Sequence, residues 1–132
     1  SDYLILVDGS LHKVAVYHGS VKNWTRVKTF TCSMGAPQSP TYKGQFVLGN
    51  AYGKYFKRIY FDDAYGDRCW YATRYYGPYL FHSVLYDRSA LPVNEIDGRV
   101  GLDISHGCIR LKLKAAKYIY DTIPEGTVVE IY

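Results

Sequence analysis

Turn signals recur through this chain about every 8–12 residues and leave only short segments between them. Several of these segments are rich in Val, Ile, Thr and Tyr, which favour β-strands. We expect strands over residues 3–7, 11–17, 24–33, 45–48, 69–76 and 127–132. Short strands at this spacing are typical of β-sandwiches and open barrels.

One segment, residues 112–123, has the period of a helix instead. Leu113, Ala116, Ile119 and Ile123 recur at the spacing that places apolar side chains on one helix face. Pro124 ends the pattern, because proline cannot continue a helix. The sequence therefore predicts a mainly β fold, either a β-sandwich or open-barrel-like, with one or two short helices.

Length and charge limit the classes of protein to consider. The 132 residues suffice for one core, so we expect a single domain over residues 1–132. The net charge of +4 comes without a cluster of Lys and Arg, which argues against a nucleic-acid partner. No run of about 18 apolar residues is present, so we expect no membrane span. The chain begins almost directly with a strand, and we expect it to be a monomeric domain excised from a longer exported protein.

The stretch Ser105–Leu111 holds a hydroxyl, an imidazole, a thiol and a guanidinium within six consecutive residues. If the stretch is extended, His106, Cys108 and Arg110 point the same way, because residues two apart share a face. Gly107 has no side chain and lets a substrate or another backbone approach the sulfur. Nearby cations favour the reactive thiolate. The pattern therefore suits a thiol nucleophile that attacks a carbonyl.

A nucleophilic cysteine also needs a base within reach, and His82 or His106 is available for this role. The structural alternative is a buried apolar cysteine and a histidine satisfied within the fold. The other two cysteines, Cys32 and Cys69, either pair in a disulfide or remain buried thiols, and we favour the thiols.

Two pairs of segments resemble a known family. Phe81–Ser83 together with Ser105–Arg110 is similar to the signature of the L,D-transpeptidases (YkuD-type catalytic domain), enzymes that cross-link bacterial peptidoglycan. Cys32–Gly35 followed by Ser39–Phe46 resembles a second segment of that family, so the similarity covers nearly the whole chain. Two departures stand out. The 26 residues from His82 to Cys108 exceed the usual spacing, and Tyr42 stands where proline is common.

The resemblance implies a role for each matching residue. Cys108 would be the acylated nucleophile, and His82 its base, oriented by the backbone carbonyl of Ser83. His106 and the backbone N–H groups of Gly107 and Cys108 would stabilise the oxyanion.

The resemblance also implies substrate-binding residues, for which we take Arg110, Ser105 and Tyr79. Arg110 would meet a substrate carboxylate, whose geometry its guanidinium matches, or form a structural ion pair beneath the site. No metal or organic cofactor is implied.

The implied reaction starts from a tetrapeptide stem of peptidoglycan. Cys108 attacks the carbonyl of the third residue, the terminal D-alanine leaves, and a second stem resolves the thioester to give a 3→3 cross-link. The enzyme would work outside the cell, at the cell wall, and would be a carbapenem target. If water resolves the thioester, the activity is L,D-carboxypeptidation.

Three further alternatives stay open. The protein is a non-catalytic wall-binding module, a cysteine peptidase of the wall, or a zinc protein with His82, His106 and Cys108 as ligands. The order of His82 before Cys108 argues against papain-like peptidases, although one geometry can be built in several chain orders.

The segment 84–104 is long and contains Gly and Pro. Long irregular loops are often active-site lids. We therefore expect this segment to form a mobile cover over the cleft.

Overall fold

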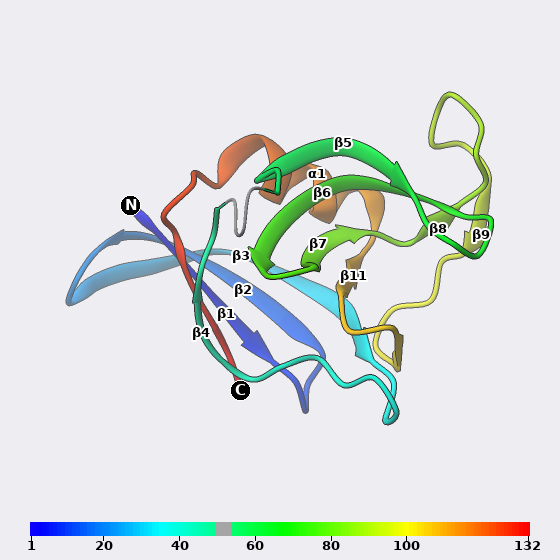
Figure 1. The fold of residues 1–132 in the computed structure, drawn as a ribbon. Helices are drawn as coiled ribbons and strands as arrows, with labels where there is room; N and C mark the ends of the chain where they lie inside the picture. Colours follow the sequence, from blue (N-terminus) through cyan, green and yellow to red (C-terminus); the bar gives the residue numbers. More distant parts are fainter. Residues whose placement is uncertain (50–53) are drawn as a thin grey trace.

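The structure, a computed structural model, describes residues 1–49 and 54–132. Strands predominate, as Figure 1 shows. The elements in chain order are β1 (Tyr3–Asp8), β2 (Lys13–Ser20), β3 (Asn23–Gly35), β4 (Gly44–Val47), β5 (Lys57–Asp62), β6 (Arg68–Tyr76), β7 (Tyr79–Ser83), β8 (Leu85–Tyr86), β9 (Glu95–Asp97), β10 (Asp103–Ser105), β11 (Ile109–Leu111), α1 (Leu113–Thr122) and β12 (Val128–Ile131).

The predicted fold class is confirmed. In the described part of the chain α1 is the one helix, within a residue of the expected bounds at each end. It buries Ala115, Ala116 and Ile119 on its apolar face and ends just before Pro124. No helix in the described part of the chain is long and apolar enough to cross a bilayer.

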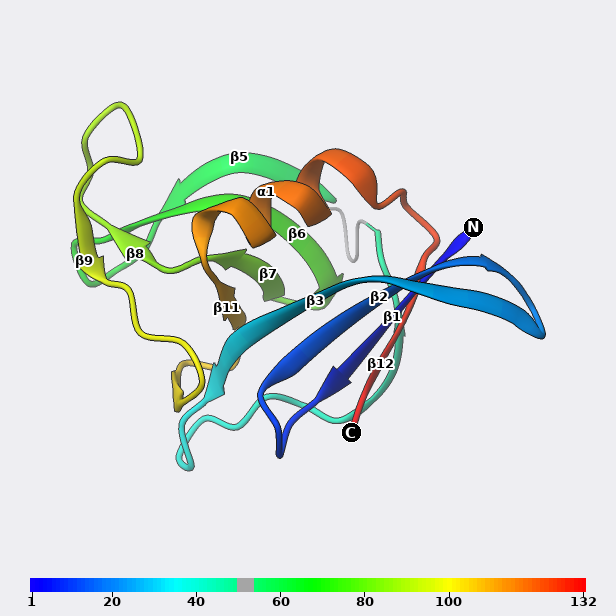
Figure 2. The same cartoon turned by 180° about the vertical axis from the view of Figure 1, so that it is seen from behind.

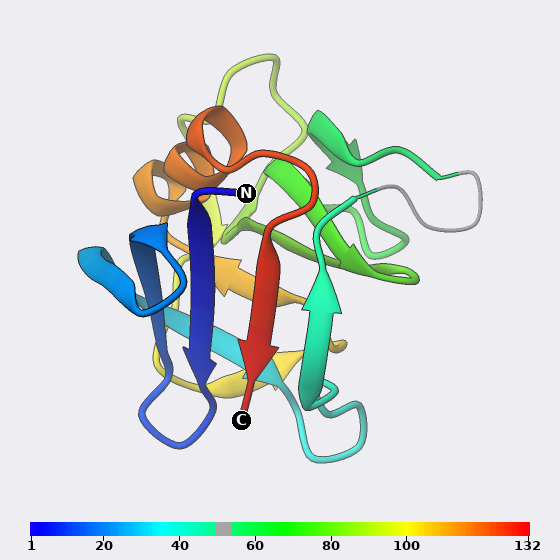
Figure 3. The same cartoon turned by 90° about the vertical axis from the view of Figure 1, so that its left-hand side faces the viewer.

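The strands form one continuous sheet that folds over on itself. Its order is β4-β12-β1-β2-β3-β11-β7-β6-β8-β9, with β10 added beside β3 and β5 beside β6. The long strand β3 joins the two halves, because its first part pairs with β2 and its last residues pair with β10 and β11. Figures 2 and 3 show the halves from two further directions, and α1 packs against β6, β7 and β11 of one half.

The core fills the space between the two half-sheets and the helix. Alternate residues of the outer strands point into it, as a half-buried strand requires. Its fully buried members include Ile5, Val7, Val14, Val16, Phe81, Ile109, Leu111, Ile119, Val129 and Ile131. Cys32 and Cys69 are also buried, both as free thiols, which confirms the preferred reading over a disulfide.

Strand β7 lies in the middle of the second half-sheet, between β6 and β11. Both faces of a central strand are covered, so Leu80, Phe81, His82 and Ser83 are all buried. An imidazole is therefore held inside the sheet rather than at its surface.

Candidate active site

The parallel pairing of β7 with β11 brings the two parts of the sequence motif together. Arg110 lies opposite His82, and Ile109 lies opposite Phe81. Cys108 immediately precedes β11, and its sulfur accepts a backbone hydrogen bond from Leu80. The sheet register thus closes the 26-residue gap between His82 and Cys108.

A pocket of about 140 Å³ lies at this junction. Five of the predicted site residues line it, namely Cys108, His82, His106, Ser105 and Arg110. The remaining lining residues are Phe61, Asp63, Tyr65, Cys69 and Leu85. Three of these come from β5 and the β5–β6 turn, for which the sequence offered only a turn signal.

His82 is buried and held in one orientation. Its Nδ1 lies 2.6 Å from the backbone oxygen of Ser83, as the resemblance implied. A carbonyl only accepts, so Nδ1 carries the proton and Nε2 keeps a free lone pair. Burial lowers the pKa of His82 to about 4, and the charge of Arg110 adds to this effect. The ring is therefore neutral at pH 7 and able to take a proton.

Ser83 fixes the carbonyl that holds His82. Its hydroxyl donates to the backbone oxygen of Val84 at 2.7 Å and accepts from the backbone N–H of Trp70 at 2.8 Å. Side-chain and backbone bonds together lock the end of β7, so the imidazole is positioned by backbone that has little freedom to move.

Cys108 is partly exposed at the pocket. Burial raises the pKa of its thiol, and the hydrogen bond from Leu80 and the charges of Arg110 and Arg74 oppose this only in part. The expectation of a thiolate favoured by nearby cations is therefore wrong for this resting structure. The resting pair is a neutral thiol and a neutral imidazole.

Gly107 breaks the extended chain that the sequence suggested. Its φ of 120° lies in the left-handed region, so the alternation of faces stops there. His106, Cys108 and Arg110 nevertheless line the same pocket. The predicted grouping is right, but a kink at glycine produces it rather than a continuous strand.

The hydroxyl of Ser105 stabilises the loop of residues 105–108, called the nucleophile loop here after the predicted role of Cys108. It donates to the backbone oxygen of Cys108 at 2.6 Å and accepts from the Gly107 N–H at 3.1 Å. The Gly107 N–H is therefore engaged within the loop, in contrast to the expected oxyanion role. Ser105 is almost fully buried, so here it shapes the loop.

Thr41 binds the same loop through its side chain, a role that the sequence did not predict. Its buried hydroxyl donates to the backbone oxygen of Gly107 at 2.9 Å and accepts from Gly35 at 2.8 Å. Ser39 donates to the backbone oxygen of Ser105 at 3.0 Å. The family-like segment Ser39–Phe46 contains both residues, and this was the available signal.

Gly107→Ala should destabilise the protein and misplace Cys108. An added Cβ would lie 2.5 Å from Cε1 of Tyr79, in a backbone conformation that L-residues rarely adopt. We expect a loss of about 1–3 kcal/mol in urea unfolding, together with reduced activity. Gly126→Ala is the matched control, since Gly126 also has a positive φ but open space around it. Equal losses in the two variants would mean that the contact with Tyr79 is unimportant.

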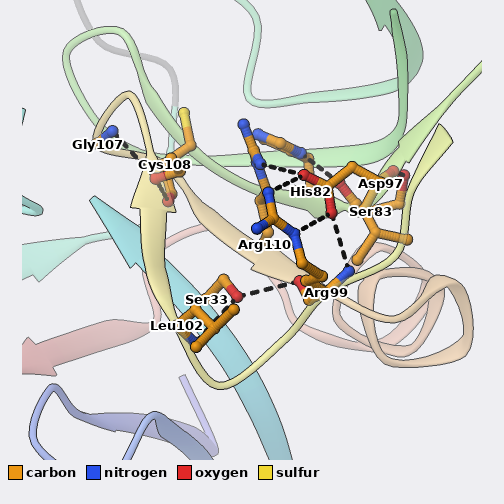
Figure 4. A network of polar contacts seen from close by, with 11 residues as sticks. Ser33, His82, Ser83, Asp97, Arg99, Leu102, Gly107, Cys108 and Arg110 are labelled. Atoms are coloured by element: carbon orange, nitrogen blue, oxygen red, sulfur yellow. Dashed lines mark hydrogen bonds and ion pairs between the residues drawn. The ribbon is translucent and has the colours of Figure 1, made fainter. Parts of the chain in front are cut away.

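Arg110 is buried between Cys108 and a carboxylate. In the view of Figure 4 it lies between Cys108 and Asp97. Its Nη1 is 4.0 Å from Asp97, and its Nε has no hydrogen-bond partner among the described residues. Arg99 binds the same carboxylate through two nitrogens, at 2.8 and 2.9 Å, and holds the pKa of Asp97 down at about 2. Asp97 thus forms a long structural ion pair with Arg110. The Nε of Arg110 has no partner among the described residues.

The side chains of His106 and Tyr79 have different contacts. The exposed ring of His106 stacks on Tyr65 with centroids 4.6 Å apart. Tyr79 packs its ring against Gly107. Tyr79 does not line the 140 Å³ pocket but borders a neighbouring hollow.

The segment 84–104 is largely tied to the sheet. Leu85 and Tyr86 pair with β6, and Gly101 donates to Cys32 at 2.8 Å. Of this segment only Leu85 lines the pocket, so the predicted cover is wrong as a description of this structure. Two residues of the β5–β6 turn, Asp63 and Tyr65, line the pocket instead. Mobility of the segment stays a prediction.

The zinc alternative finds no suitable geometry. No group of three or more His, Cys, Asp or Glu side chains within residues 1–49 and 54–132 is placed to hold a metal ion. His82, His106 and Cys108 share a pocket without forming such a group.

Comparison with known proteins agrees with the geometry. The family model of the L,D-transpeptidase catalytic domain (YkuD) matches residues 2–131. This chain belongs to that family. "Putative L,D-transpeptidase YciB" of Bacillus subtilis (strain 168) is 34% identical over 110 residues, which cover 80% of this chain and 55% of that protein.

Solved structures show the same fold. A Clostridium acetobutylicum protein, described as a fused Zn-dependent amidase/peptidase/peptidoglycan-binding domain-containing protein, superposes with a TM-score of 0.80 at 39% identity. The match covers all of this chain and 52% of that one. The L,D-transpeptidase LdtMt1, solved in complex with imipenem, gives a TM-score of 0.72 at 22% identity over 99% of this chain and 59% of its own. This L,D-transpeptidase domain therefore spans about half the length of such relatives.

Proposed function

We propose that this domain is a peptidoglycan L,D-transpeptidase that forms 3→3 cross-links through a thioester on Cys108. The observation that supports this most strongly is the neutral imidazole of His82, which the Ser83 carbonyl holds in place and which lines the same small pocket as Cys108. A neutral thiol needs such a base at the moment of attack. Family membership supplies the substrate class.

In the first half of the proposed reaction, the Cys108 sulfur bonds to the carbonyl carbon of the third stem residue. His82 takes the thiol proton at Nε2. The amide bond to the terminal D-alanine then breaks, and the leaving amine receives that proton from His82. The result is a thioester and free D-alanine.

In the second half, the side-chain amine of another stem attacks the thioester carbonyl. A new amide bond forms, the carbon–sulfur bond breaks, and the amine proton returns through His82 to the thiol. Water in place of the amine would give a tripeptide. Both halves of the reaction balance in atoms and protons without a metal or cofactor.

Charge that develops on the attacked carbonyl oxygen needs hydrogen-bond donors. We assign this role to the Cys108 N–H and His106, because the Gly107 N–H is engaged by Ser105. Loss of one such donor typically costs about 10²–10³ in rate.

Arg110 is proposed to bind a stem carboxylate. Its guanidinium lines the pocket, and its contact with Asp97 is long. A bidentate carboxylate would pair with such a group at closer range. The proposed setting is the cell wall, outside the membrane, with a monomeric catalytic domain.

The test is incubation with a disaccharide-tetrapeptide, followed by mass analysis of products and intact protein. We expect a cross-linked dimer of stems, free D-alanine and a thioester adduct on the protein. Tripeptide without dimer would change the assignment to L,D-carboxypeptidase. Fragment binding without adduct or turnover would favour the wall-binding module.

Imipenem offers a second, simpler probe, because the relative LdtMt1 has been solved in complex with it. An imipenem adduct without turnover of the stem peptide would mean that Cys108 is a competent nucleophile and that the stem peptide tested is an unsuitable substrate.

A further inference from the structure

Four aromatic side chains form a continuous surface beside the nucleophile loop. This aromatic platform consists of Tyr42, Phe46, Tyr76 and Tyr79. Tyr79 meets Tyr42 edge-on at 5.2 Å and Tyr76 in a parallel stack at 6.4 Å, and Phe46 lies 4.9 Å from Tyr76. The residues come from β4, the segment before it, the end of β6 and the start of β7, and Figure 3 shows these parts of the backbone on the same side of the molecule.

Two of the four rings of the platform are exposed, and the other two, Phe46 and Tyr79, are half-buried against the core. Tyr42 is 51% exposed and Tyr76 42%. Two open hollows flank it, of about 540 and 460 Å³. Polar side chains lie among the aromatic rings, with Lys43 and Gln45 in one hollow and Lys54 in the other.

The pocket at Cys108 is too small for the whole substrate. Its volume of about 140 Å³ falls below the roughly 300–1,000 Å³ of typical small-molecule sites, whereas both flanking hollows fall within that range. The reacting carbonyl can enter the pocket, but the rest of a disaccharide-peptide must lie on the surface next to it.

We propose that the aromatic platform binds the sugar rings of the glycan strand that carries the stem peptide, an inference that rests on the proposed function. A pyranose ring presents C–H groups on its faces and hydroxyl and N-acetyl groups at its edge. The C–H face packs on an aromatic ring, while the edge groups meet tyrosine hydroxyls, Gln45 or Lys43. Tyrosine suits this use because it has an apolar body and a polar tip.

The geometry places the platform at a suitable distance. It starts at Gly107, where Tyr79 packs against the backbone next to Cys108. From Tyr79 the rings continue through Tyr76 to Phe46, and the two centroid spacings of 6.4 and 4.9 Å limit this reach to about 11 Å. Three extended residues span about the same distance, at roughly 3.3–3.6 Å each. This is the separation between the sugar and the third stem residue.

The charge of the surroundings also fits this ligand rather than an apolar protein partner. Lys43 and Lys54 lie beside the platform, and the chain carries a net charge of +4. A wall strand with stem carboxylates is anionic, so these lysines attract it.

The test compares two substrates, the disaccharide-tetrapeptide and the free tetrapeptide. For the wild type we expect a higher kcat/KM with the disaccharide. In the variant Tyr42→Ala/Tyr76→Ala this preference should fall by about tenfold, roughly the effect of losing two aromatic contacts. Turnover of the free tetrapeptide should be unchanged. Tyr132→Ala is the control, because Tyr132 is similarly exposed but lines a different hollow, with residues of β1, β2 and β3.

The outcomes separate the two proposals. A wild type without preference for the disaccharide, or equal losses on both substrates in the variant, would overturn the platform and leave the transpeptidase intact. If neither substrate turns over, binding of the stem-free disaccharide to Cys108→Ala decides the matter. Saturable binding that Tyr42→Ala/Tyr76→Ala weakens would support the platform, and absence of binding would overturn it.

Discussion

Cys108→Ala is expected to abolish thioester formation and to lower turnover by roughly 10⁴-fold or more. Removing the nucleophile of a covalent mechanism has effects of this size, because the remaining groups then act only on bound substrate. The variant should fold, since Cys108 is partly exposed and alanine fits the space. Intact-protein mass measurement after exposure to stem peptide or imipenem reads the adduct directly.

The matched control is Cys69→Ala, because Cys69 lines the same pocket and is also a free thiol. Burial raises the pKa of Cys69 strongly, and its side chain is 2% exposed. A thiol so placed is a poor nucleophile. The control should keep its adduct and most of its activity. An adduct that survives in Cys108→Ala and disappears in Cys69→Ala would reverse the assignment.

The sequence was most informative where the relevant pattern is local. The helix at residues 113–122, the turn after Asp8 and the strands around it depend on periodicity and on residues with strong turn preferences. The motif at Cys108 is local too, and so it could be read directly. His82 was found only because a nucleophile needs a base and the family resemblance names one.

Long-range pairing was not available from such patterns. Nothing local indicates that β3 joins both half-sheets, or that β7 and β11 run in parallel with His82 opposite Arg110. The same holds for Thr41, whose role depends on reaching Gly107 from 66 residues away. These contacts are set by how the whole sheet closes, not by the residues next to them.

The protonation states of Cys108 and His82 were also not predictable from the sequence. The sequence places cations near Cys108, which favours a thiolate, but it gives no measure of burial. In the structure burial raises the pKa of Cys108 and lowers that of His82. Desolvation disfavours the charged form of both groups, and it outweighs Arg110 at the thiol. The difference changes the proposed mechanism from a preformed ion pair to general-base attack.

His82→Gln is expected to reduce the rate of acylation by about 10²–10⁴-fold, the usual contribution of a positioned base. Glutamine is neutral at every pH and has no basic nitrogen, so the substitution removes the base without adding a charge. Stopped-flow measurement of the adduct with imipenem isolates this step from turnover. His18→Gln, at an exposed histidine in β2, is the control and should react like the wild type.

The same substitution has a second consequence, in the pH dependence of stability. The folded-state pKa of His82 is about 4, whereas an unfolded histidine titrates near 6.5. Between these values the unfolded chain binds more protons, so the free energy of unfolding falls as the pH is lowered from 6.5 to 4. The loss from this residue reaches about 3 kcal/mol. In urea unfolding His82→Gln should lack this part of the slope, and His18→Gln should keep it. A wild-type slope retained in His82→Gln would mean that His82 titrates in the folded protein as it does in the unfolded chain, so that burial does not lower its pKa.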